Sequence, residues 1–225
     1  LIENVISNRS LQLSLAGHTS RRSKILDTRG EHLEALDLNR AFSPYKNKRQ
    51  AYVRITRGCN KFCSYCVVPF TRGAETHRHP KLIVDEVAKL VNSGIVEVTL
   101  IGQSVNHYKH VENGITTNFA DLLWQIHEAT PNLIRLRFVT SYPKNFSDDM
   151  LKIMAESPRI CRYLHLPAQS GSNEILKKMN RGYTREQYLS LIDRARNTIK
   201  DIRFAGDMIV GFSGETDEDH RLSIE

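Results

Sequence analysis

The sequence predicts an α/β fold with a parallel sheet, and three observations support this prediction. Short apolar runs rich in β-branched residues alternate with helix-like stretches about every 30 to 40 residues. Strands joined by helices run parallel, because only a helical crossover returns the chain to the same end of the sheet. A glycine-rich phosphate loop after the first run would favour a dinucleotide-binding fold, but a cysteine-rich loop follows that run instead. The pattern allows an open doubly wound sheet or a barrel, and in both the chemistry belongs at the carboxyl ends of the strands.

The strands are expected where apolar, β-branched residues cluster: residues 52–56, 95–101, 133–140, 162–166 and 203–212. The helix after the first strand has clear ends, since Pro80 suits a first turn and Gly94 can take the left-handed conformation that ends a helix. Another helix is expected over residues 119–129. The other helix starts are indicated by N-capping residues: Ser147, Ser172, and Thr184 with Gln187 in a capping box.

Charge divides the chain into two parts. The net charge is +7, and residues 1–57 hold 11 basic and 5 acidic side chains, so most of the excess lies there. Such a segment can follow a phosphate backbone, or it can be a solvated linker. We predict a basic interdomain arm over residues 1–48 and a core domain over residues 49–225. Because the chain starts at Leu1 and stops within what looks like a new helix, we expect a fragment.

No signal of a membrane or secreted protein is present. The sequence holds no uninterrupted apolar stretch of roughly 18 residues, and its start lacks the order of a signal peptide. We therefore expect a cytoplasmic protein with no membrane partner, in which the four cysteines are reduced.

Three of those cysteines form a CxxxCxxC loop: Cys59, Cys63 and Cys66. Gly58 lets the backbone turn immediately after the first strand, so three thiolates from one loop can converge on one inorganic body. A 4Fe–4S cluster usually takes four cysteine ligands. Three ligands would leave one iron open, as a catalytic metal site keeps an open position.

Zinc is the main alternative for this loop, because His77 or His79 could complete a Cys3His tetrahedron. The spacing disfavours zinc, since structural zinc sites usually pair CxxC units that are separated in the chain. Cys161 stands apart before an apolar run, and we expect it to be a buried, inert thiol.

From about Arg49 onward the chain resembles the radical S-adenosylmethionine (SAM) methylthiotransferases. The resemblance is carried by five blocks in order: GCNKFCSYCVVPFTRG at 58–73, LIGQSVNHY at 100–108, LRFVTSYP at 136–143, LHLPAQSGSNEILKKMNRGYT at 164–184 and DMIVGFSGET at 207–216. It implies a partial (βα)6 TIM-like barrel whose last strand is missing here. It also implies a missing amino-terminal domain with a second 4Fe–4S cluster and a missing RNA-binding domain, so the fragment alone is expected to be inactive.

The resemblance assigns roles to individual residues. It makes Cys59, Cys63 and Cys66 the cluster ligands and the catalytic centre. The positions that match cofactor-binding or substrate-lining sites are Tyr65, Gly102, Gln103, Ser141, Gln169 and Gly211. For the last three the alternative is turn chemistry. Arg72, Glu75 and Arg78 could order the loop or meet RNA phosphate, and His165 is expected to be a core residue.

The branch of the family that modifies isopentenylated adenosine beside the tRNA anticodon is the most similar. The resemblance therefore implies a transferase that methylthiolates carbon 2 of N(6)-isopentenyladenosine and takes its electron from flavodoxin or ferredoxin. We expect a monomer that binds the tRNA anticodon loop. The alternatives are a methylthiotransferase for threonylcarbamoyl-adenosine in tRNA, one for an aspartate of a ribosomal protein, and, more remotely, a zinc-binding RNA module.

Overall fold

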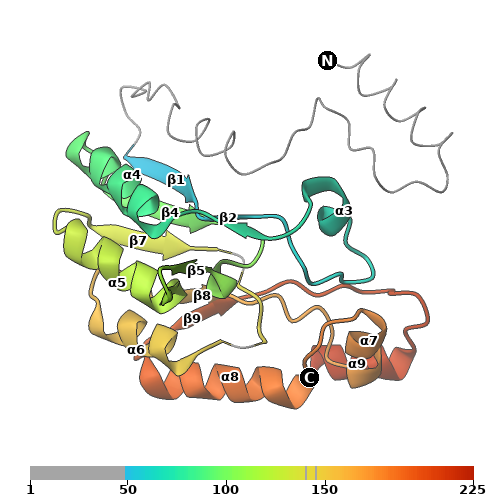
Figure 1. Cartoon of the computed structure of the whole chain (residues 1–225). Coiled ribbons are helices and arrows are strands. Elements are labelled where there is room, and N and C mark those ends of the chain that lie inside the picture. The colour runs from blue at the N-terminus through green and yellow to red at the C-terminus, as the bar shows by residue number, and fades with distance from the viewer. Residues whose placement is uncertain (1–48, 140, 145) are drawn as a thin grey trace, which may run out of the picture. The chain divides into compact units, whose positions relative to one another are not determined.

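A central parallel sheet organises the computed structural model, which describes residues 49–139, 141–144 and 146–225 (Figure 1). The predicted arm over residues 1–48 lies outside the described residues. Strand β4 (Glu97–Ile101) lies between β1 (Gln50–Arg54) and β7 (Arg135–Phe138), and both pairings are parallel. Strands β8 (Tyr163–His165) and β9 (Arg203–Ala205) form a second parallel pair. A parallel bridge from Leu136 to Ile160 continues the strand order from β7 toward β8.

The five predicted strands are present, and the parallel α/β fold is confirmed. The first predicted run is split into β1 and the short β2 (Thr56–Arg57), which pairs antiparallel with β3 (Thr76–His77). The last predicted run is much shorter than expected, since β9 ends at Ala205. A side chain at Gly206 would come within 2.6 Å of the Leu166 carbonyl oxygen, and pairing resumes only as a bridge between Gln169 and Met208.

The predicted helix starts are also confirmed. Pro80 begins α4 (Pro80–Asn92), and α5 (Phe119–Ala129) has the predicted bounds. The predicted caps accept backbone hydrogen bonds at the starts of α6 (Asp148–Glu156), α7 (Asn173–Lys178) and α8 (Arg185–Thr198). The chain ends with α9 (Asp217–Ile224). None of the helices in the described part of the chain is both long enough and apolar enough to span a membrane.

Five elements were not predicted. Besides β3, these are α3 (Val68–Arg72), the 3-10 helix η2 (Val105–His107), and the strands β5 (Lys109–Glu112) and β6 (Ile115–Asn118), which form a hairpin. The hairpin has a recognisable signal, because an Asn-Gly pair favours the two-residue turn that needs positive φ at both positions. Asn113 and Gly114 have φ of 50° and 78°.

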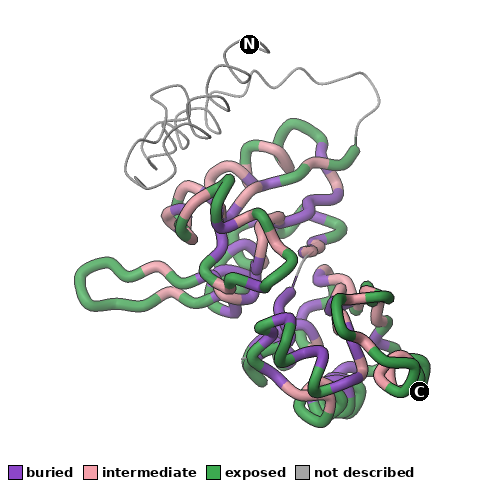
Figure 2. Tube along the Cα trace, turned by 90° about the vertical axis from the view of Figure 1, so that its right-hand side faces the viewer, coloured by how far each residue is buried: buried purple, intermediate pink, exposed green. Residues whose placement is uncertain are grey.

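The core lies between the strands and one layer of helices. Helices α4, α5, α6 and α8 contact one another in that order along this layer (Figure 1). Strand β4 is buried along most of its length, as expected of the central strand of a parallel sheet. Buried residues gather along the strands and the inner sides of the helices, while the outer surface is exposed (Figure 2).

One buried amide joins the loops that follow β4 and β7. The Asn106 side chain donates to the Tyr142 carbonyl oxygen and accepts from the Tyr142 backbone N–H, both at 2.8 Å. Because both backbone groups of Tyr142 are satisfied by this amide, the two loops are held in fixed positions at the carboxyl edge of the sheet.

Candidate functional site

A cavity of about 300 Å³ lies beside the cysteine loop and the loops that follow the strands. Eight of the residues predicted for the cluster or the cofactor line it: Cys59, Cys63, Cys66, Tyr65, Gly102, Gln103, Ser141 and Gln169. These residues come from segments far apart in the sequence, so the fold gathers them at one place. Gly211 is the exception. It is exposed, its N–H donates to the Glu215 carboxylate, and it is not among the residues that line the cavity.

The cysteine loop begins at a position that only glycine fits well. Gly58 has φ of 74°, and a side chain there would meet the Ala74 carbonyl oxygen at 2.1 Å. The Cys59 N–H donates to the Gly73 carbonyl at 3.2 Å, so the two ends of the segment are joined. Cys59 and Cys63 are buried, Cys66 is half-buried, and all three are free thiols. Burial raises the pKa of the Cys59 thiol.

Two polar groups in the cavity make no hydrogen bond within the described part of the chain. They are the side-chain oxygens of Gln103 and Ser141, and both atoms are buried. A buried polar atom without a partner is costly, which indicates that a bound group satisfies it. Three thiols and two free oxygen acceptors therefore make this cavity suitable for a metal cluster and a polar cofactor.

Six further residues line the cavity, and three of them carry a charged or phenolic side chain that was not predicted there: Lys61, Tyr142 and Arg181. Arg181 is almost fully buried and donates to the Cys63 sulfur. Burial raises the pKa of the Tyr142 phenol to about 12, so this group stays neutral at physiological pH. All three residues lie within or beside the five sequence blocks, but nothing in their local pattern shows that they turn inward.

The structure disfavours the zinc alternative, because both candidate histidines form contacts with residues other than the three cysteines. His77 Nδ1 accepts from the Lys109 N–H, and its Nε2 lies 3.5 Å from Glu75. His79 Nδ1 accepts from the Lys81 N–H at 3.1 Å. Neither histidine lines the cysteine cavity.

A separate group of possible metal ligands brings His79, His110 and Glu112 within 4.8 Å of one another. His79 Nδ1 accepts the cap hydrogen bond from Lys81, so a neutral His79 carries its proton on Nε2. That proton points to Glu112, 3.1 Å away. A hydrogen bond from His79 to Glu112 therefore explains why these two side chains lie close together.

The charged residues that follow the cysteine loop divide into two kinds. Arg78 is buried and donates to the Arg54 carbonyl at 2.7 Å and to Glu86 at 2.8 Å, which makes it a structural residue. Glu75 has a largely buried side chain whose pKa is raised by burial. Arg72 is exposed at the end of α3 and is free to meet a solvent-borne partner.

The two residues expected in the core are only partly buried. His165, at the end of β8, has its Nε2 3.1 Å from the carboxylate of Asp207, which follows β9. Cys161 is partly buried, lies outside the cysteine cavity, and has a pKa raised by burial.

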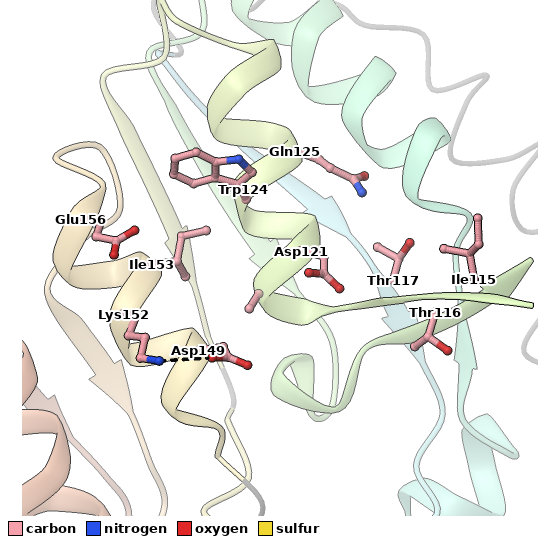
Figure 3. A pocket seen from close by; sticks show the side chains of 11 residues that line it. Ile115, Thr116, Thr117, Asp121, Trp124, Gln125, Asp149, Lys152, Ile153 and Glu156 are labelled. Carbon is pink, nitrogen blue, oxygen red and sulfur yellow. Dashed lines mark ion pairs between the residues drawn. The ribbon is translucent and has the colours of Figure 1, made fainter.

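A larger hollow of about 530 Å³ lies between the β5–β6 hairpin, α5 and α6 (Figure 3). Its walls carry Trp124, Asp121 and Glu156, and Lys152 there pairs with Asp149 at 3.8 Å. No cysteine or histidine lines this hollow, and none of the predicted site residues does. The smaller cavity at the cysteine loop is therefore the candidate site.

Comparison with known proteins gives a consistent result. The radical SAM superfamily matches residues 53–225. The chain is 50% identical over 177 residues to the tRNA-2-methylthio-N(6)-dimethylallyladenosine synthase of Thermoanaerobacter sp. (strain X514), covering 78% of this chain and 37% of that protein. It is 47% identical over 202 residues to the protein of that name from Clostridium botulinum (strain Eklund 17B / Type B), covering 89% and 42%. The chain thus spans about two fifths of the length of these curated relatives.

Solved structures resemble the chain in fold. The radical SAM methyltransferase TsrM from Kitasatospora setae, with cobalamin and a [4Fe-4S] cluster bound, superposes with a TM-score of 0.62 at 24% identity. The match covers 78% of this chain and 33% of that one. Methylornithine synthase superposes with a TM-score of 0.51 at 16% identity, covering 78% and 48%.

Proposed function

The chain belongs to the radical SAM superfamily, and from this membership we propose that Cys59, Cys63 and Cys66 hold a 4Fe–4S cluster with one iron open to SAM. The observation that carries the proposal is that these three free thiols line one cavity together with the unpartnered oxygens of Gln103 and Ser141. The strand order β1, β4, β7, β8 and β9 supports five strands of a partial (βα)6 barrel.

The residues around the thiols bind and orient in this proposal. Gln103 offers a donor and an acceptor to the amino and carboxylate groups of SAM, and Ser141 offers a hydroxyl. Gly102 lines the same cavity and packs closely against Thr56, because a side chain at position 102 would meet the Thr56 hydroxyl oxygen at 2.0 Å. Tyr65 would flank the adenine of bound SAM, and Gln169 also lines the cavity. Gly211 does not line this cavity, so it can contact the cofactor or the substrate only if the bound molecule extends beyond the cavity.

The reaction needs chemistry that no side chain provides. Carbon 2 of an adenine carries a hydrogen of no useful acidity, so a general base cannot remove it. The bound cluster and SAM would supply one-electron chemistry for this step. The protein's contribution is to position the base, to keep water out and to hold the thiolates in place.

We propose that the substrate is N(6)-isopentenyladenosine beside a tRNA anticodon and that the product is its 2-methylthio derivative. The names of the relatives that are 50% and 47% identical to this chain support this interpretation. A second 4Fe–4S cluster, a flavodoxin-type or ferredoxin-type electron donor, a monomeric state and a cytoplasmic location belong to the same proposal. The sister activities on threonylcarbamoyl-adenosine and on a ribosomal aspartate remain the alternatives.

Exposed aromatic side chains beside the cavity suit a single-stranded RNA loop. Phe62 is 54% exposed and Phe70 is 78% exposed, and their ring centroids lie 6.1 Å apart. Phe62 has φ of 49°, and the Asn180 side chain holds this conformation by donating to the Phe62 carbonyl at 3.0 Å. Aromatic rings that project into solvent can stack on unpaired bases, which is how proteins commonly hold single-stranded RNA.

Removing these rings is expected to weaken RNA binding. Stacking contributes about 1–3 kcal/mol per base, so Phe62→Ala and Phe70→Ala should each lower the affinity for an anticodon stem-loop by about tenfold. Fluorescence anisotropy at constant salt measures this effect. Ile115→Ala removes an apolar side chain that is 73% exposed on the β5–β6 hairpin and does not line the cysteine cavity, so it should leave the affinity unchanged. If Phe62→Ala and Phe70→Ala bind the RNA as tightly as Ile115→Ala does, the two phenylalanines are not part of the RNA-binding site.

The substrate is tested in cells. We expect tRNA from cells that lack the full-length gene to lose 2-methylthio-N(6)-isopentenyladenosine and to accumulate the unthiolated nucleoside. Mass spectrometry of digested tRNA distinguishes this result from the loss of the threonylcarbamoyl derivative. An unchanged tRNA profile would direct the search to the ribosomal protein.

A further inference from the structure

Arg181 places a buried positive charge against the cysteine loop. The residue follows α7, and only 6% of its surface is exposed. All three guanidinium nitrogens donate hydrogen bonds: Nε to the Tyr183 hydroxyl at 3.0 Å, Nη1 to the Cys63 sulfur at 3.3 Å and the Tyr65 hydroxyl at 3.2 Å, and Nη2 to the Pro167 carbonyl at 3.2 Å.

This cation has no carboxylate partner among the residues that the structure describes. Its neighbours are neutral phenols and a carbonyl, and the rings of Tyr142 and Tyr183 lie 4.7 and 5.2 Å from the guanidinium carbon. A buried charge without a counter-ion is costly, and cation–π contacts offset only part of the cost. The thiol of Cys63 is the group in this shell that becomes an anion when it binds a metal.

Contacts made by the two residues before Arg181 fix its position relative to the loop. The Ser64 N–H donates to the Met179 carbonyl at 3.1 Å, and the Asn180 side chain donates to the Phe62 carbonyl. Residues 179–181 therefore contact the cysteine loop at three successive positions. The hydrogen bond from the Arg181 side chain to the Cys63 sulfur is the third of these contacts. The other two hold the backbone before Arg181 against the loop.

We propose that Arg181 is a positioning residue that raises the reduction potential of the cluster through its hydrogen bond to the Cys63 sulfur. The inference rests on the proposed function, because it takes Cys63 as a cluster ligand. One electron enters the cluster on reduction, and no proton is transferred, since arginine stays protonated. The reduced cluster carries one more negative charge, so a cationic donor at a ligand sulfur stabilises the reduced form more than the oxidised form.

The potential is measured by redox titration of the anaerobically reconstituted chain, with dithionite as reductant and electron paramagnetic resonance as readout. At the wild-type midpoint we expect the ratio of reduced to oxidised cluster to fall about tenfold in Arg181→Gln, which equals about 59 mV for a one-electron couple. Arg181→Lys keeps the charge but loses the planar fork, so a smaller fall of about threefold is expected. Lys200→Gln removes an exposed charge and should titrate as wild type.

A purely structural role gives a different result. In that case Arg181→Gln would lower the melting temperature and the iron content per chain, but the clusters that form would titrate at the wild-type midpoint, and the proposal would be overturned. If Arg181→Gln does not fold, Arg181→Lys and Tyr183→Phe decide. Arg181→Lys must lower the ratio of reduced to oxidised cluster. Tyr183→Phe keeps the hydrogen bond from Arg181 to the Cys63 sulfur, so it must leave this ratio unchanged. Wild-type chain that binds no cluster would overturn the proposed function, and this inference with it.

Discussion

Replacement of Cys63 by alanine is expected to abolish the iron–sulfur chromophore of the reconstituted chain. The cavity offers three thiols, and a cluster held by two of them would leave two irons without protein ligands. Loss of an outer-shell partner alone costs about 10–100-fold in metal affinity, so loss of a ligand should leave less than about a tenth of the wild-type iron. Iron analysis and visible absorption after anaerobic reconstitution measure the result.

Cys161→Ala is the matched control for this experiment. Cys161 is a free cysteine that does not line the cavity, so its variant should bind iron as the wild type does. Brown wild-type protein distinguishes a cluster from colourless zinc. Full iron binding by Cys63→Ala, or by the variant in which Cys59, Cys63 and Cys66 are all alanine, contradicts the assignment of the site.

The second large effect is expected at Gly58. A side chain there would lie 2.1 Å from the Ala74 carbonyl oxygen and 2.5 Å from that of Gly73, and the φ of 74° is unfavourable for any residue with a Cβ. Because backbone atoms cannot move away as a side chain can, Gly58→Ala should lower the free energy of unfolding by about 3 kcal/mol or more. Chemical denaturation of the metal-free chain measures this without any contribution from a cluster.

Gly114→Ala separates the effect of backbone strain from that of crowding. Gly114 has a similar φ of 78°, but a side chain there would meet nothing within 4 Å. Its variant should lose only about 1–2 kcal/mol, the cost of the left-handed conformation. If both variants lose the same amount, the close approach of residues 73 and 74 to Gly58 contributes nothing to stability.

Local signals in the sequence were sufficient to predict most helices and strands. The caps at Ser147, Ser172 and Thr184 act within one helical turn, and the three cysteines lie within one loop, so both features can be found without knowing the fold. The Asn113-Gly114 turn has an equally local signal and was overlooked.

Features that depend on distant residues could not be predicted in this way. Arg181 meets Cys63 across 118 positions of sequence, and neither residue's neighbours indicate the contact. The choice between an open sheet and a barrel depends on the strand order, which periodicity does not contain. Gly211 sits in a block of sequence similar to the family, yet its turn lies outside the cavity, since its N–H is taken up by Glu215.

The contact between residues 179–181 and the cysteine loop has a consequence for synthesis on the ribosome. At roughly 5–20 residues per second, translation needs about 6 to 24 s to proceed from Cys63 to Arg181, which lies 118 positions further along the chain. During that time the nascent loop lacks the partners that hold it, and its thiols face any oxidant in the surroundings. Delivery of iron and sulfide would therefore follow translation, and reducing conditions would be needed before it.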